Sequence, residues 1–201
     1  MLPWGHLAVG YLLYSGGTRL WHRRSPDDAP TLLALLGTQA PDLVDKPLNW
    51  WLAVFDGRGI GHSLLTTVPV CAMVYLFARR RGRGEWGAAF GFGVLTHLFA
   101  DAFYPVLRGA SSLDAPYLLW PLREAPTYPS ENVMDHVLRV VVHFSALRHR
   151  APVDILTDRF VIQVLLVPLV VGIWALDGFP GLPDRDPSPG GDSTNDWMEK
   201  W

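Results

Sequence analysis

Five side chains that can bind metal ions interrupt or border stretches of this sequence that are otherwise apolar. Three are histidines and two are aspartates: His6, Asp42, His62, His97 and Asp101. An aspartate inside a membrane segment costs about 2.5–3.5 kcal/mol on insertion scales, so such a residue usually has a partner or a function. Imidazole nitrogens and carboxylate oxygens are ligands of Zn²⁺, and Mn²⁺ and Fe²⁺ accept the same set. The residue types therefore predict a divalent metal site.

His97 and Asp101 show how one helix could supply two ligands. They are four positions apart, so their side chains share one helical face, one turn apart. Five ligands exceed the four that a tetrahedral zinc ion needs, so we expect one or two ions, with a bridging carboxylate in the second case. A metal would offset the cost of burying the carboxylates and would acidify a water molecule that attacks an ester.

Each of the five residues also has a structural interpretation when it is taken alone. His6 could be an interfacial histidine, and His62 could lie at a helix end. Asp42 could be a cap or turn residue. His97 and Asp101 could form a hydrogen-bonded pair within one helix. We prefer the metal site because four separate segments bring these residues to a similar depth.

Four further polar residues are candidates for supporting roles. Asp45 could be the general acid or base, another ligand, or a solvated loop charge. Asp135 is the second candidate for the acid or base. His136 and Arg139 are second-tier candidates, and Arg139 could bind a substrate phosphate. Asp135 can also pair with Arg139 at i,i+4, and we favour this structural role for the segment.

Six apolar segments must position these side chains. A membrane-spanning helix needs about 20 apolar residues, and three of the segments are about that long. Two others are short or polar and could be partial or interfacial helices. We predict an all-α, multi-pass transmembrane bundle of about five to six helices, with a soluble helical core as the alternative. Gly87 and Gly91 have a spacing that lets helices approach closely. The segments are 5–21, 31–44, 63–78, 86–107, 133–147 and 160–176.

Basic residues set the expected orientation of the bundle. If the segments alternate in direction, ten arginines fall on one side, which we expect to be cytoplasmic. The candidate ligands then lie near the opposite, extracytoplasmic face of the cell membrane. The N-terminus, the 46–61 and 108–132 loops and the C-terminal tail are expected on that face as well. The arginines are Arg19, Arg23, Arg24, Arg79, Arg80, Arg81, Arg83, Arg148, Arg150 and Arg159.

Composition excludes several classes of protein and divides the chain in two. Only 18% of the 201 residues are charged, below the roughly 25% of a typical soluble domain. A single cysteine excludes an internal disulfide framework, and a net charge of −2 excludes a strongly basic nucleic-acid binder.

Residues 1–176 form the predicted membrane domain. Residues 177–201 carry six acidic residues, and we predict that they form a disordered, solvated tail.

Short motifs follow one another along residues 1–125: Trp4-Gly5-His6, Pro41-Asp42, Gly61-His62-Ser63, His97-x-x-x-Asp101, Tyr104-Pro105 and Trp120-Pro121-Leu122. This ordered set resembles the YdjM-like family of membrane-bound, metal-dependent hydrolases, also called LexA-binding inner-membrane-associated hydrolases. The family is distantly similar to zinc-dependent phospholipase C and the P1-type nucleases, helical enzymes whose clustered zinc ions cleave phosphoesters. The resemblance implies that the same three histidines and two aspartates are metal ligands. The family often has a Pro-Asp-x-Asp acid pair, whereas Asp42 and Asp45 are one residue further apart here.

These observations lead us to expect a membrane hydrolase in which a metal-activated water attacks a phosphoester or another ester near the outer leaflet. The depth of the site favours a lipid or lipid-linked substrate. A membrane scaffold or regulator would instead use the polar residues as buried hydrogen bonds. A transporter would use them as a proton or metal path, and would spread polar residues through the full depth of the membrane. The chain contains neither His-Glu-x-x-His nor Gly-x-Ser-x-Gly, which disfavours zinc proteases and serine hydrolases of those types.

Overall fold

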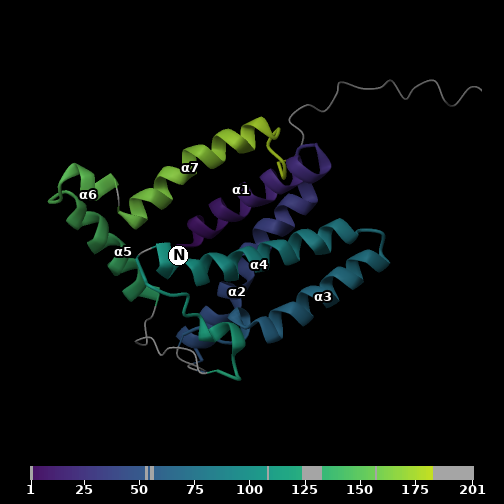
Figure 1. Ribbon diagram of the computed structural model, residues 1–201, viewed down its shortest axis with the longest axis horizontal. Helices are drawn as coiled ribbons and strands as arrows, with labels where there is room; N and C mark the ends of the chain where they lie inside the picture. Colours follow the sequence, from purple (N-terminus) through teal and green to yellow (C-terminus); the bar gives the residue numbers. More distant parts are fainter. Residues whose placement is uncertain are drawn as a thin grey trace, which may run out of the picture.

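The computed structural model describes residues 2–52, 54, 57–107, 109–123, 133–156 and 158–182, and these residues contain helices and no strands. Each of the six predicted apolar segments coincides with a helix, so the all-α prediction is confirmed (Figure 1). The elements are α1 (Pro3–His22), α2 (Asp28–Trp50), η1 (Ile60–His62), α3 (Leu64–Arg80), α4 (Gly84–Leu107), η2 (Pro116–Leu119), α5 (Val133–Leu147), α6 (Pro152–Leu156) and α7 (Arg159–Leu176).

Local signals explain where three of the helices begin. Pro3 lies in the first turn of α1, where its fixed φ suits a helix and its missing N–H removes no hydrogen bond. Ser63 caps α3, because its side chain accepts a hydrogen bond from the backbone N–H of Leu65. Asp158 caps α7 in the same way, accepting from the backbone N–H of Phe160.

The second helix is longer than its apolar segment predicts. The sequence predicts an end at residue 44, close to Pro41, whereas α2 continues to Trp50 with Pro41 and Pro47 inside it. A proline inside a helix removes one backbone hydrogen bond, and packing against neighbouring helices compensates for the loss in membrane proteins. Asp42 and Asp45 therefore lie within a helix, and their interpretation as turn or loop residues is wrong.

Two glycines bring α2 and α4 into backbone contact. A Cβ atom on Gly37 would lie 2.2 Å from the carbonyl oxygen of Phe90, and one on Gly93 would lie 2.0 Å from that of Ala34. Neither distance is possible for a side chain, so the close approach requires glycine at both positions. His97 follows Gly93 by one helical turn, so this contact fixes its height relative to α2.

α3 and α4 form an antiparallel hairpin. Its turn contains Gly82 at φ +71°, in the left-handed region that glycine adopts without strain. A Cβ atom on Gly87 would lie 2.6 Å from the Cα of Tyr75, so α4 approaches α3 at backbone distance as well. A Cβ atom on Gly91 would meet Cys71 at an ordinary 3.5 Å. The close approach predicted from the Gly87–Gly91 spacing is confirmed, and Gly87 is the residue that requires it.

α1 and α7 run in the same direction, because hydrogen bonds join them at both ends. The backbone N–H of Leu2 donates to Oε1 of Gln163 at one end. Arg19 donates to the carboxylate of Asp177 at the other end. The start of α7 therefore lies beside the start of α1 (Figure 1).

Asp177 belongs to the folded domain and not to a solvated tail. Its carboxylate accepts hydrogen bonds from the hydroxyl groups of Tyr11 and Ser15, both at 2.6 Å, and from the guanidinium of Arg19. Burial alone would raise the pKa of Asp177, but these donors hold it below its usual value. The prediction of a tail that begins at Asp177 is wrong by at least six residues, and residues 183–201 lie outside the described part of the chain.

The parallel arrangement of α1 and α7 overturns part of the predicted topology. Alternating segments would place Arg148, Arg150 and Arg159 beside Arg19, but α7 begins at the Leu2 end of α1. α4 ends and α7 begins at the same end of the bundle, so α5 and α6 do not cross it (Figure 1). The arginines are therefore divided between the two ends, and the described start of the C-terminal region lies at the Arg19 end.

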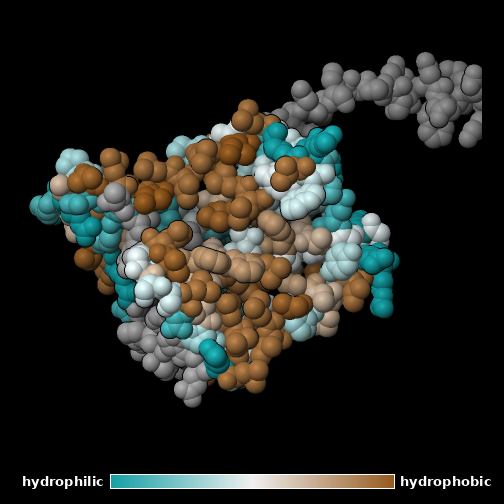
Figure 2. All heavy atoms as spheres, viewed as in Figure 1, coloured by the Kyte–Doolittle hydropathy of each residue, from teal (hydrophilic) through white to brown (hydrophobic). Residues whose placement is uncertain are grey.

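Apolar side chains cover much of the outside of the bundle, as Figure 2 shows for one face. Exposed apolar areas of this extent are unusual for soluble proteins. Among the described residues, α4 is the one helix long and apolar enough to cross a bilayer, and α7 contains a shorter apolar stretch. The exposed apolar residues of α3 and α7 include Leu65, Val68, Val70, Met73, Leu76, Phe77, Ile162, Val164, Leu165, Val167, Leu169 and Val171.

We predict that Gly93→Ala destabilises the protein. Its methyl group would meet the Ala34 carbonyl oxygen at 2.0 Å, and overpacking of this kind costs about 1–3 kcal/mol. The measurement is the free energy of unfolding of the detergent-purified protein. Gly91→Ala is the matched control on the same helix and should be neutral or stabilising by up to about 1 kcal/mol. Equal stability of the two variants would contradict the backbone contact between α2 and α4.

Candidate metal centre

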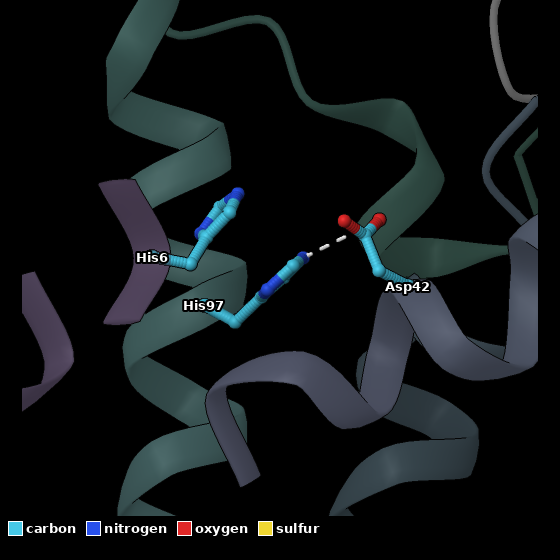
Figure 3. Close-up of side chains that lie close together, drawn as sticks. All are labelled: His6, Asp42 and His97. Carbon is cyan, nitrogen blue, oxygen red and sulfur yellow. Dashed lines mark ion pairs between the residues drawn. The ribbon is translucent and has the colours of Figure 1, made fainter. Parts of the chain in front are cut away.

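The five residues singled out in the sequence converge at one end of the bundle. His6 lies near the start of α1, Asp42 in the second half of α2, His62 at the end of η1, and His97 and Asp101 in the second half of α4. Figure 3 shows His6, Asp42 and His97 directed toward one another from three helices. The three imidazoles are each 1% exposed, whereas the Asp42 side chain is 15% exposed. The cluster is therefore buried and is most accessible at Asp42.

The nitrogen and oxygen atoms of the cluster have the separations expected of ligands that share a metal ion. His62 Nε2 lies 3.1 Å from His97 Nε2. Asp42 Oδ1 is 3.7 Å from the first of these nitrogens and 3.9 Å from the second. Asp101 Oδ2 is 3.6 and 3.9 Å from the same two atoms. Ligand atoms held at 2.0–2.2 Å around a tetrahedral ion are about 3.3–3.6 Å apart, so small shifts would complete the coordination.

His6 extends the cluster on the side of α1. Its ring stacks on that of His97 with centroids 3.8 Å apart, and its Nε2 lies 3.3 Å from Asp101 Oδ1. Two overlapping groups of three ligand atoms result, each within 4.8 Å, and His97 belongs to both. The predicted buried His and Asp groups able to hold a metal are thus confirmed, while the identity and number of the ions stay a prediction. The groups are His6, Asp42, His97 and His62, His97, Asp101.

The partners of the other ring nitrogens fix the protonation pattern of the two central histidines. His97 Nδ1 lies 2.6 Å from the backbone carbonyl oxygen of Thr38, which can only accept, so Nδ1 carries the proton. His62 Nδ1 lies 2.7 Å from the carboxylate of Asp45 and donates to it. In their neutral forms, both rings therefore direct an unprotonated Nε2 at each other. Two lone pairs beside two carboxylates repel, and a cation between them removes the repulsion.

The surroundings of His62 favour positive charge at this position. Burial alone would lower the pKa of His62, but hydrogen bonds to Asp101 and Asp45 outweigh burial and raise it. A proton on Nε2 of His62 would relieve the repulsion from His97 in the same way as a metal ion. A metal must displace that proton, so we expect metal affinity to fall as the pH is lowered.

Asp45 positions His62. It is 2% exposed, and besides the imidazole its carboxylate accepts hydrogen bonds from the backbone N–H groups of Gly59 and Gly61. A Cβ atom on Gly61 would lie 2.5 Å from the carbonyl oxygen of Pro41, so η1 is held tightly against α2. Asp45 was a sequence candidate for the acid or base, but its contacts are those of a carboxylate that orients a metal-binding histidine.

The remaining sequence candidates are not among the potential ligands that the structure describes. Asp135 and Arg139 are exposed on α5 and belong to neither group of potential ligands. The side chain of His136 lies outside what the structure describes. The acid–base role predicted for Asp135 and the phosphate-binding role predicted for Arg139 therefore gain no support from their placement.

Three residues of the site were not singled out from the sequence. Lys46 Nζ lies 2.5 Å from Asp42 Oδ2, and an Arg58 nitrogen lies 2.5 Å from Asp101 Oδ2. Tyr117 of η2 is buried with its ring edge-on to His62. The i,i+4 spacing of Asp42 and Lys46 is a signal that could have found the first pair. Arg58 lies in the connection between α2 and η1, and Tyr117 lies in the short η2. No local sequence pattern predicts where these two segments pack.

Comparison with known proteins gives one match. The model of a family described as YdjM inner membrane protein matches residues 1–178, which include every described helix. No curated protein and no solved structure matches the chain. The distant similarity to zinc-dependent phospholipase C and the P1-type nucleases stays a prediction.

We predict that Asp45→Asn weakens binding of Zn²⁺ by about 10–100-fold, because His62 loses the carboxylate that fixes its ring orientation. The measurement is a competitive titration of metal-stripped protein in detergent with a zinc chelator. Asp135→Asn, which replaces an exposed carboxylate on α5, is the control and should leave the affinity unchanged. The positioning role would be refuted by an equal affinity of Asp45→Asn and parent for zinc.

Proposed function

The chain belongs to the YdjM inner membrane protein family, and we propose that it is a membrane-bound, metal-dependent hydrolase of a phosphoester or another ester. The observation that supports this proposal is the orientation of two buried imidazoles, whose Nε2 atoms lie 3.1 Å apart beside two carboxylates. The ligand types and their separations suit Zn²⁺, with Mn²⁺ or Fe²⁺ as alternatives.

Some residues of the centre would bind the metal ion, and others orient the metal-binding side chains. His6, Asp42, His62, His97 and Asp101 would hold one or two divalent ions, which would supply Lewis acidity and lower the pKa of a water molecule. Asp45 and the Thr38 carbonyl keep the two central imidazoles in the tautomer that binds metal. The substrate enters beside Asp42, because the other four ligands are almost fully buried.

The proposal includes a revised multi-pass topology. α1, α2, α3, α4 and α7 cross the membrane, and α5 lies along the surface on the side of the metal centre. An α-helix rises 1.5 Å per residue, so the 17 to 24 residues of these helices reach about 26–36 Å, close to the 30 Å hydrocarbon core. The centre then lies near one membrane surface, where a lipid or lipid-linked substrate is accessible.

We place the centre at the extracytoplasmic surface. The support is the density of the arginines at the far end of the bundle, in the short turn between α3 and α4 and at the end of α1, since clustered basic residues in short connections favour the cytoplasm. Arginines at the metal-centre end, such as Arg58, Arg123 and Arg139, are spread along the chain. The C-terminal region then begins in the cytoplasm, contrary to the sequence-based expectation. The arginines at the far end are Arg19, Arg23, Arg24, Arg79, Arg80, Arg81 and Arg83.

We predict that zinc-loaded protein hydrolyses members of a panel of chromogenic phosphoesters and carboxylic esters. Asp101→Ala should reduce the rate by a factor on the order of 100, because it removes one ligand of the activating ion. Chelation should abolish the activity and added metal should restore it.

Activity that persists without metal would refute the mechanism, whereas metal binding without hydrolysis of any ester would favour a transport role. A scaffold predicts that no metal copurifies and that Asp101→Asn is tolerated.

The topology predicts the labelling of single cysteines by a membrane-impermeant maleimide in a Cys71→Ser background. Arg123→Cys, at the same end of the bundle as the metal centre, should react in intact cells, whereas Arg81→Cys and Leu182→Cys should react only after lysis. The parallel packing of α1 and α7 requires the last two positions to share one side. Labelling of both Leu182→Cys and Arg123→Cys in intact cells would contradict that packing. Labelling of Arg81→Cys and Leu182→Cys but not of Arg123→Cys in intact cells would contradict only the proposed orientation in the membrane.

A further inference from the structure

Two cationic side chains stand at the edge of the metal centre. Lys46 Nζ contacts Asp42 and an Arg58 nitrogen contacts Asp101, each at 2.5 Å. Their side chains are 28% and 26% exposed, whereas that of Asp101 is 3% exposed. Each cation therefore extends from the solvent-accessible rim to a carboxylate that belongs to the metal-binding cluster.

Aromatic rings hold both cations in place. The Arg58 guanidinium lies 4.7 Å from the ring centroid of Tyr117, and Lys46 Nζ lies 5.9 Å from that of Trp50. Tyr117 itself packs against His62, so the rim and the metal ligands form one structure. The hydroxyl group of Ser63 donates a hydrogen bond to the carbonyl oxygen of Trp120. This hydrogen bond holds the segment that contains Tyr117 against the start of α3.

We propose that Lys46 and Arg58 bind the phosphate group of the substrate, which makes the protein a phosphoesterase and not a carboxylesterase. This inference rests on the proposed metal-dependent hydrolase function. A guanidinium offers paired donors to two phosphate oxygens, and an ammonium group adds a point charge. The two cations flank Asp42, the most accessible ligand, and Asp101, so a phosphate that enters there meets both cations and the metal position.

The charge balance of the centre also favours an anionic substrate. Asp42, Asp45 and Asp101 contribute three negative charges, and Lys46 and Arg58 contribute two positive ones. With neutral imidazoles and one divalent ion, the centre has a net charge of +1 before the water molecule loses its proton, and a second ion raises that charge to +3. A phosphodiester or phosphomonoester neutralises this charge in a buried site, whereas an uncharged carboxylic ester leaves it uncompensated.

A purely structural role for the two cations predicts a different pattern of binding. If Lys46 and Arg58 only neutralised the carboxylates, removing either would favour metal binding and leave the affinity for phosphate unchanged. If they also bind phosphate, removing either should weaken phosphate binding while metal affinity stays equal or increases. The two affinities therefore separate the roles.

The test titrates inorganic phosphate into zinc-loaded, detergent-purified protein by calorimetry, after zinc affinity has been measured separately. Lys46→Gln and Arg58→Gln should each weaken phosphate binding by about tenfold or more, with zinc still bound. Arg58→Lys should restore part of the loss. Arg123→Gln, which removes an exposed arginine from the segment that follows η2, is the matched control and should change neither affinity.

The outcomes distinguish this inference from the proposed function on which it rests. Zinc binding with phosphate affinity unchanged in both glutamine variants would overturn the phosphate-binding role and leave the metal-dependent hydrolase standing. Absence of zinc binding by the parent protein would overturn both. A loss of phosphate affinity confined to zinc-loaded protein, together with cleavage of phosphoesters in preference to carboxylic esters, would support both.

Discussion

The close approach of two imidazole nitrogens is the constraint on which the chemistry of this site depends. Nε2 of His62 and Nε2 of His97 lie 3.1 Å apart in a buried site, and the other nitrogen of each ring donates to Asp45 or to the Thr38 carbonyl. The fold thus fixes both rings so that their lone pairs meet. Such an arrangement is unfavourable without a positive charge between the rings, and a proton or a metal ion can supply it.

Close contacts between helices determine where the two rings lie. Gly37 and Gly93 bring α2 and α4 together, which places His97 against the Thr38 carbonyl. Gly61 lets η1 approach α2, which places His62 against Asp45. Small residues are the means by which helices approach closely where lipid provides no hydrophobic driving force.

Much of the fold and of the ligand set could be predicted from the sequence, because both depend on local patterns. Apolar stretches located six helices. Polar residues within or beside these stretches identified all five potential ligands, namely His6, Asp42, His62, His97 and Asp101. The direction of α7 could not be predicted, because it depends on long-range hydrogen bonds such as the one from Arg19 to Asp177. Arg58 was missed for a similar reason, since its ion pair with Asp101 spans 43 residues of irregular and helical chain.

The two buried polar clusters along α1 differ in how their hydrogen-bonding groups are satisfied. At the far end, Asp177 is a buried acceptor surrounded by donors, namely the hydroxyl groups of Tyr11 and Ser15 and the guanidinium of Arg19. Such a cluster is satisfied by protein groups alone and stabilises helix packing. At the His6 end, Asp42 and Asp101 pair with Lys46 and Arg58, but the neutral imidazoles of His62 and His97 add two acceptor nitrogens that face each other. A scaffold needs only the first kind of cluster, whereas the second kind gains stability by binding a cation, which is a metal ion under the proposed function.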